Sequence, residues 1–177
     1  MRILIYGFGA YRQFKQNITQ QVLGKLRRSA GLKKIVFPVR FDRRQFTSAV
    51  KQYRPDVVLG LGQCSRGRLM RIERRAINRK RNNGKGRARP IVRGGPRRLP
   101  TTLKLETLGL GKSAKVSRDA GDYVCNFSMY IMLNYLRRCR PDARFGFIHI
   151  PRDFNPERVV RFVRRILRKA VGKCSTR

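Results

Sequence analysis

Short runs of apolar residues alternate with amphipathic stretches along most of this chain, and this alternation constrains the fold more than any other feature. The apolar runs, rich in β-branched and aromatic residues, predict strands over 2–6, 34–39, 57–61, 115–117 and 145–150. Apolar residues at helical spacing predict helices over 18–26, 43–53, 100–110, 123–136 and 156–171. Residues 68–78 fit either a strand or an irregular segment. Strands that alternate with helices predict an α/β fold.

Two segments concentrate positive charge. Residues 79–98 are rich in Lys, Arg, Asn and Gly and nearly without apolar residues, which predicts a basic loop. The last predicted helix, 156–171, is amphipathic, and we expect its apolar face to pack on the sheet and its arginine face to meet solvent. Neither an internal repeat nor a domain linker is visible, so 177 residues predict one domain spanning 1–177.

The charge balance is extreme, with 44 Lys and Arg against 9 Asp and Glu, a net charge of +35. At most nine basic groups can have a private acidic partner, so the surface stays strongly positive. We therefore expect non-specific association with polyanions such as nucleic acid. A homo-oligomer is possible, although this charge opposes self-association at low salt.

The sequence also indicates a compartment. Apolar runs such as 57–61 are too short to cross a bilayer, and residues 1–6 are too short for the apolar region of a signal peptide. The four cysteines lack CxxC spacing and predict neither a disulfide framework nor a zinc site; they are Cys64, Cys125, Cys139 and Cys174. We expect no membrane association and no metal, and we expect the reducing cytoplasm.

Three residues could carry chemistry. His149, the one histidine, lies near the carboxyl end of the predicted strand 145–150, where open α/β sheets gather catalytic groups. Cys125 lies in a turn that opens into the predicted helix 123–136, where the helix dipole favours a thiolate and free N–H groups could form an oxyanion hole. Glu73 could orient an imidazole and stabilise its charged form. Each has a simpler alternative: a hydrogen-bonded core histidine, a buried structural cysteine and a solvated carboxylate.

These three residues lie in the blocks 146–151, 116–126 and 72–78, and together the blocks resemble one family closely. That family is the pyrrolidone-carboxylate (pyroglutamyl) peptidases, cysteine enzymes that remove an N-terminal pyroglutamate. Further similarity lies at 7–11, Asn17, 37–39, 57–63 and 90–96. The resemblance covers roughly residues 1–153, in the order of the family.

The resemblance implies a fold and a mechanism. The fold is phosphorylase/hydrolase-like: a single domain with a twisted, mixed, mostly parallel sheet and helices on both faces. Cys125 would be the nucleophile, His149 the general base and later the general acid, and Glu73 the partner of the imidazole. Hydrolysis would pass through a thioester and needs neither a metal nor another cofactor.

The resemblance also implies a substrate pocket, formed by Phe8, Tyr11, Asn17, Gln63, Tyr123 and Val124. The first two side chains would sandwich the five-membered lactam ring of an N-terminally pyroglutamylated peptide, and the last two would complete the slot. The amide of Asn17 and the backbone at Gln63 would hydrogen-bond the ring amide. A small neutral ring needs an apolar pocket with few fixed polar groups, and this set supplies both.

Several residues depart from the family pattern. Tyr11 stands where phenylalanine is usual, and residues 79–87 contain no apolar side chain that could form a pocket wall. Asp122, in place of the frequent threonine, could cap the helix, but its charge opposes thiolate formation. The histidine block continues with Arg152. Two alternatives follow: the same triad acting on a different small amide, or a basic protein that binds nucleic acid or another polyanion on a peptidase scaffold.

Overall fold

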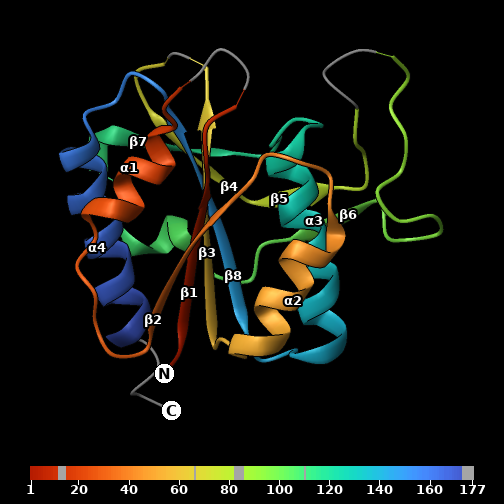
Figure 1. Ribbon diagram of the computed structural model, residues 1–177, viewed down its shortest axis with the longest axis horizontal. Helices are drawn as coiled ribbons and strands as arrows, with labels where there is room; N and C mark the ends of the chain where they lie inside the picture. Colours follow the sequence, from red (N-terminus) through yellow and green to blue (C-terminus); the bar gives the residue numbers. More distant parts are fainter. Residues whose placement is uncertain (12–14, 66, 82–85, 110, 173–177) are drawn as a thin grey trace.

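Six strands form one sheet in the order β2-β1-β3-β8-β4-β7 in a computed structural model, which describes residues 1–177 except 12–14, 66, 82–85, 110 and 173–177 (Figure 1). The strands are β1 (Ile3–Phe8), β2 (Leu32–Phe37), β3 (Val57–Cys64), β4 (Met70–Glu73), β7 (Ala114–Ser117) and β8 (Arg144–Pro151). Neighbouring strands run parallel, except that β4 and β8 are antiparallel. The sheet is therefore mixed and mostly parallel, as predicted.

Helices cover both faces of this sheet (Figure 1). One face carries α1 (Ile18–Lys25) and α4 (Pro156–Gly172), and the other carries α2 (Arg43–Tyr53) and α3 (Val124–Cys139). Each layer buries its own apolar core against the sheet. The predicted α/β fold with helices on both faces is confirmed.

Local sequence explains the helices. At the start of α2 the carboxylate of Asp42 accepts a hydrogen bond of 2.8 Å from the backbone N–H of Arg44, which caps the helix. Phe46, Ala49 and Val50 are buried on one face, and Arg54 ends the helix in the left-handed region, with φ 48°. The last helix, α4, likewise buries its apolar face and exposes most of its arginines.

No helix in the described part of the chain is long and apolar enough to cross a membrane.

The prediction of a helix over 100–110 is wrong. A short strand, β6 (Arg98–Pro100), pairs with β5 (Arg75–Ile77), and only a 3₁₀ turn, η2 (Leu105–Leu108), follows. Leu103 and Leu105 are both buried, and alternate burial is the pattern of an extended chain rather than a helix. The backbone N–H of Leu103 bonds the carbonyl of Phe145, so this segment runs beside β8 where β4 no longer pairs with it.

Other boundaries differ by a few residues. The strand predicted over 34–39 begins and ends two residues earlier, and 68–78 resolves into β4 and β5. The described part of 79–98 contains an isolated bridge between Lys80 and Arg89, and a second 3₁₀ turn, η3 (Gly111–Ser113), precedes β7.

The β1–β3 boundary positions the site. The two strands pair only as far as Tyr6 and Gly60. Beyond that point β1 continues to pair with β2, and β3 continues to pair with β8, so the two strands separate. The chain leaves β1 toward β2 on one side and then crosses to β3 on the other side, so this boundary is a topological switch point. Ligands of open α/β sheets bind at the carboxyl ends of strands at such points.

Candidate active site

Glu73 and His149 form a buried pair. β4 and β8 run antiparallel with Arg71 opposite His149, which places Glu73 on the same face and diagonal to the imidazole. The Nδ1 atom of His149 lies 2.7 Å from Oε1 of Glu73, and the two residues are 3% and 0% exposed. With Nδ1–H donating to the carboxylate, Nε2 is the ring nitrogen that can accept a proton.

Arg71 adds a positive charge to this pair. Its Nε lies 3.7 Å from Oε1 of Glu73, too far for a hydrogen bond but close enough for electrostatic attraction. The second carboxylate oxygen, Oε2, is buried without a hydrogen-bond partner among the described residues. The carboxylate is thus held by the imidazole on one atom and by the charge of a neighbouring guanidinium.

A glycine brings the thiol to the imidazole. Gly62 lies opposite His149 in the β3–β8 ladder. A Cβ atom at position 62 would lie 2.8 Å from Sγ of Cys125 and 2.9 Å from Cδ2 of His149. Cδ2 is bonded to Nε2, so the ring edge facing away from Glu73 shares this small space with the thiol. The missing side chain at Gly62 makes room for both groups.

Cys125 is the second residue of α3, where the first-turn N–H groups have no partner inside the helix. Tyr123 is the N-cap and provides no side-chain hydrogen bond. Asp122 could cap the helix by its sequence position, but it does not: its carboxylate forms an ion pair with Arg81, Oδ2 to Nε 3.2 Å. The uncapped N–H groups are the candidate oxyanion hole.

Two buried side chains fix the start of α3. The amide of Asn126 accepts from the backbone N–H of Ile77 at 2.9 Å and donates to the carbonyls of Ile77 and Arg79. The hydroxyl of Ser128 donates to the carbonyl of Cys125 and accepts from the hydroxyl of Tyr6. The thiol of Cys125 therefore stands on a helix terminus that is tied to both β5 and β1.

Burial sets the protonation of the thiol. It raises the pKa of Cys125 from 9.0 to about 12; the charges of Cys64 and Glu73 add to the rise, and Arg71 opposes it. Desolvation of the anion thus acts against the helix dipole and favours a protonated resting thiol.

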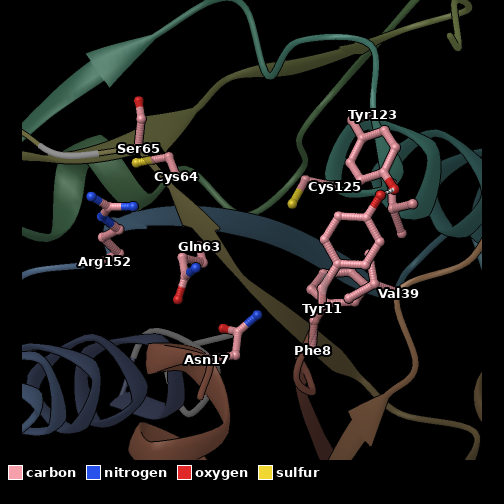
Figure 2. A pocket seen from close by; sticks show the side chains of 11 residues that line it. Phe8, Tyr11, Asn17, Val39, Gln63, Cys64, Ser65, Tyr123, Cys125 and Arg152 are labelled. Carbon is pink, nitrogen blue, oxygen red and sulfur yellow. Dashed lines mark hydrogen bonds between the residues drawn. The ribbon is translucent and has the colours of Figure 1, made fainter. Parts of the chain in front are cut away.

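A cavity of about 270 Å³ opens beside this thiol (Figure 2). All six residues expected in the substrate pocket line it together with Cys125; four more that the sequence did not indicate are Val39, Cys64, Ser65 and Arg152. These four follow the carboxyl ends of β2, β3 and β8 or end those strands, so the rule for open sheets could have found them. None of the described residues of 79–98 lines the cavity.

The aromatic end of the cavity is pre-assembled. The rings of Tyr11 and Tyr123 lie 5.5 Å apart, and their hydroxyls are hydrogen-bonded. Phe41 meets Tyr123 edge to face at 5.4 Å and supports it from behind. The tyrosine at position 11 thus completes a contact that phenylalanine could not make.

The polar groups of the cavity are partly engaged within the protein. Oδ1 of Asn17 accepts from both the backbone N–H and the hydroxyl of Thr19, and its Nδ2 donates to the carbonyl of Gly9. The second amide hydrogen of Asn17 has no partner among the described residues and could bind a ligand. The side chain of Gln63 accepts from the N–H of Ile18, which leaves its backbone as the expected contact.

An α/β sheet that gathers a thiol, an imidazole and a carboxylate at its carboxyl edge, beside a mostly apolar cavity, defines a triad cysteine hydrolase. Residues 1–164 match the family model for pyroglutamyl peptidase. The chain therefore belongs to the pyroglutamyl peptidase family.

Individual relatives agree. A pyrrolidone-carboxylate peptidase of Erwinia tasmaniensis is 40% identical over 124 residues, which is 64% of this chain and 56% of that protein. Pyrrolidone-carboxylate peptidase 1 of Caldanaerobacter subterraneus is 31% identical over 176 residues, 90% of this chain and 86% of the relative. The solved pyrrolidone carboxyl peptidase of Thermococcus litoralis has the same fold, with a TM-score of 0.88 over 98% of this chain and 94% of that one at 20% identity.

Proposed function

We propose that this protein hydrolyses the amide bond after an N-terminal pyroglutamate, with Cys125 as nucleophile. The observation that carries the proposal is that Cys125 lines a cavity with an aromatic slot at one end (Figure 2). The ring of the His149–Glu73 pair borders the same thiol in the space that Gly62 leaves open. Membership of the family supports the same reaction.

The geometry supports a sequence of proton transfers. Nε2 of His149 takes the thiol proton as Sγ attacks the carbonyl, since the resting thiol of Cys125 is protonated. Glu73 stabilises the imidazolium through Nδ1–H, and the first-turn N–H groups of α3 stabilise the oxyanion. Nε2 then returns the proton to the leaving amine, which gives a thioester. Water, deprotonated by the same nitrogen, releases pyroglutamate and restores the thiol.

The lactam ring fits the aromatic end. Phe8, Tyr11 and Tyr123 offer apolar ring faces to a small cyclic amide, and Val124 closes the slot. The remaining amide hydrogen of Asn17 and the backbone at Gln63 bind the polar atoms of the ring. Side chains outside 79–87, including Val39, line the cavity and give it an apolar wall.

The direct test is release of a fluorescent amine from its pyroglutamyl conjugate. The wild-type protein is expected to release the amine, and Cys125→Ala to release none. Cys64→Ala is the matched control, because it removes a second thiol that lines the same cavity. Equal activity of wild-type protein and Cys125→Ala would overturn the proposal.

We also propose that the basic surface associates with polyanions without sequence preference. Two adjoining hollows of about 290 and 700 Å³ run along α4, and both are lined by Arg158 and Arg165. Arg161 and Arg168 line the smaller one. Clustered guanidinium groups bind phosphates and release counterions.

The proposed compartment is the cytoplasm. Cys64, Cys125 and Cys139 are free thiols, which fits a reducing compartment. The net charge of +35 favours separate chains at low salt and permits a homo-oligomer where salt screens the charge.

A further inference from the structure

We propose that a cationic hollow beside the catalytic cavity binds an acidic side chain of the leaving peptide through Arg68 and Lys115. The protein therefore prefers pyroglutamyl peptides that carry Asp or Glu at the first or second residue after the scissile bond. This inference rests on the function proposed above and adds the substrate class to it.

The hollow adjoins the catalytic cavity. Its volume is about 230 Å³, and Cys64 and Ser65 line both this hollow and the cavity that contains Cys125. In Figure 2 these two residues lie away from the aromatic end of the cavity, and Cys125 lies between the two ends. With the lactam ring in the aromatic end and the scissile carbonyl at Sγ of Cys125, the leaving peptide extends across Cys64 and Ser65 toward the hollow.

Strand register places one cation of the hollow in line with His149. Lys115 on β7 pairs with Arg71 on β4, and Arg71 lies opposite His149 on β8. Residues paired directly across neighbouring strands project from the same face of a sheet. Lys115 therefore stands on the same face as the imidazole, two strands away from it.

The second cation comes from the turn between β3 and β4, which contains Arg68. A Cβ atom at Gly67 would lie 3.6 Å from Cγ of Pro151, so this turn packs on the end of β8. The strands β3 and β8 also carry Gly62 and His149. The hollow is thus held at a fixed position relative to the reacting atoms.

The side chains of Arg68 and Lys115 are available to a ligand. Both residues are exposed, and neither side chain forms a hydrogen bond or an ion pair with the described part of the chain. Arg71 also lines the hollow, but the carboxylate of Glu73 lies 3.7 Å from its Nε and partly compensates its charge. None of the described residues that line the hollow is an aspartate or glutamate. The hollow therefore offers two uncommitted positive charges to an anion.

An acidic side chain in the hollow gains two charged partners that its neutral isostere lacks. Exposed ion pairs are weak, so two of them correspond to a preference of roughly three- to ten-fold in kcat/KM. The same pairs exist in the bound substrate and in the transition state, so the preference should come from KM rather than kcat.

The experiment compares two pairs of isosteric substrates at one ionic strength. The first pair is pyroglutamyl-glutamyl-glycine amide and pyroglutamyl-glutaminyl-glycine amide; the second pair is pyroglutamyl-glycyl-glutamic acid amide and pyroglutamyl-glycyl-glutamine amide. In at least one pair, wild-type protein is expected to cleave the acidic member roughly three- to ten-fold more efficiently. The double variant Arg68→Gln, Lys115→Gln should bring that ratio close to one. Because each ratio compares two substrates on one protein, a general loss of activity cancels.

Two further variants separate the hollow from the general field of the protein. Arg68→Glu alone should turn the preference toward the neutral member of the pair, because it places an anion in the hollow. Arg28 and Lys33 are exposed near the opposite edge of the sheet, before and on β2. The double variant Arg28→Gln, Lys33→Gln removes the same charge and should keep the wild-type ratio. Urea denaturation checks that each variant is folded.

The outcomes separate the two proposals. Turnover without a preference in either pair, or a preference that survives Arg68→Gln, Lys115→Gln, overturns the role of the hollow and leaves the proposed function intact. An equal loss of preference in Arg28→Gln, Lys33→Gln also overturns it, since net charge alone then explains the effect. Absence of turnover on every pyroglutamyl substrate overturns the proposed function and this inference with it.

Discussion

Glu73 and His149 meet through a buried contact of 2.7 Å even though they are 76 positions apart in the chain and lie on strands of opposite direction. The antiparallel pairing of β4 and β8 places Glu73 diagonally across from His149, with Arg71 directly opposite the ring. The carboxylate therefore fixes both the orientation of the imidazole and its tautomer.

Glu73→Gln is expected to lower kcat by roughly 10²-fold or more and to change KM little, since catalysis depends on the histidine tautomer. A glutamine amide can donate to Nδ1, which would leave the ring proton on Nε2. A protonated Nε2 cannot accept the proton of the thiol. Steady-state kinetics on a pyroglutamyl amide measure this. A Glu73→Gln protein with wild-type kcat would show that the pair is only structural.

Gly62→Ala should abolish most activity, because a Cβ at this position would lie 2.8 Å from Sγ of Cys125 and 2.8 Å from the ring of Phe147. The matched control is Gly24→Ala in α1, where no atom lies within 4 Å of the new Cβ. That change should leave activity intact and stabilise the helix by about 1 kcal/mol. Kinetics and urea denaturation of both variants provide the comparison. An active Gly62→Ala protein would contradict the claim that the thiol of Cys125 and the ring of His149 need the space at Gly62.

The raised pKa of Cys125 predicts a loss of stability at alkaline pH. Burial raises this pKa from 9.0 to about 12, so the unfolded chain releases the thiol proton first as the pH rises. Stability from this group is complete below pH 9 and falls between pH 9 and 12, by at most about 1.4 kcal/mol per pH unit.

Cys125→Ala should therefore lose less stability than wild-type protein between pH 8.5 and 10, as measured by urea denaturation at each pH. Cys139→Ala is the control, because that thiol is exposed. Identical pH dependence of the wild-type and Cys125→Ala proteins would mean that the folded surroundings do not raise the pKa of this thiol.

The arginine-lined hollows along α4 predict salt-sensitive binding to DNA, RNA or polyphosphate. Binding should weaken by orders of magnitude between ~50 and ~200 mM salt if roughly six phosphates are contacted. Replacing Arg158, Arg161 and Arg168 by glutamine should reduce both affinity and the salt slope. The same replacement of Arg44, Arg137 and Arg138, exposed on the opposite helical layer, should have a smaller effect. Salt-independent affinity would refute the electrostatic explanation.

Much of the fold could be predicted because hydrophobic periodicity is local. The helix 43–53 is predicted to the residue, since its apolar spacing lies within the segment and its two caps lie directly beside it. The helix prediction for 100–110 is wrong because it relied on the leucine spacing alone. In the folded chain the backbone of Phe145 on β8 hydrogen-bonds this segment and holds it in an extended form. That competing partner lies over forty positions away and leaves no local signal.

The site shows the same division. Resemblance to a family indicated Cys125, His149, Glu73 and six pocket residues. The structure places the thiol and the six pocket residues around one cavity, and the His149–Glu73 pair borders the same thiol. The family resemblance did not indicate Ser65 or Arg152 as pocket residues. Only the general rule for the carboxyl ends of strands could have pointed to them, and the β3–β8 pairing brings these two turns together. The raised pKa of the Cys125 thiol also escaped prediction, since desolvation depends on the surroundings that only the folded chain creates.

The central claim is that Cys125 forms a pyroglutamyl thioester, and partitioning of that intermediate tests it most directly. Two pyroglutamyl amides with different leaving amines are hydrolysed in the presence of hydroxylamine, and the ratio of pyroglutamyl hydroxamate to free pyroglutamate is measured. A common thioester predicts the same ratio from both substrates, with both products lost in Cys125→Ala. A ratio that depends on the leaving amine, or products that persist without this thiol, would contradict the mechanism.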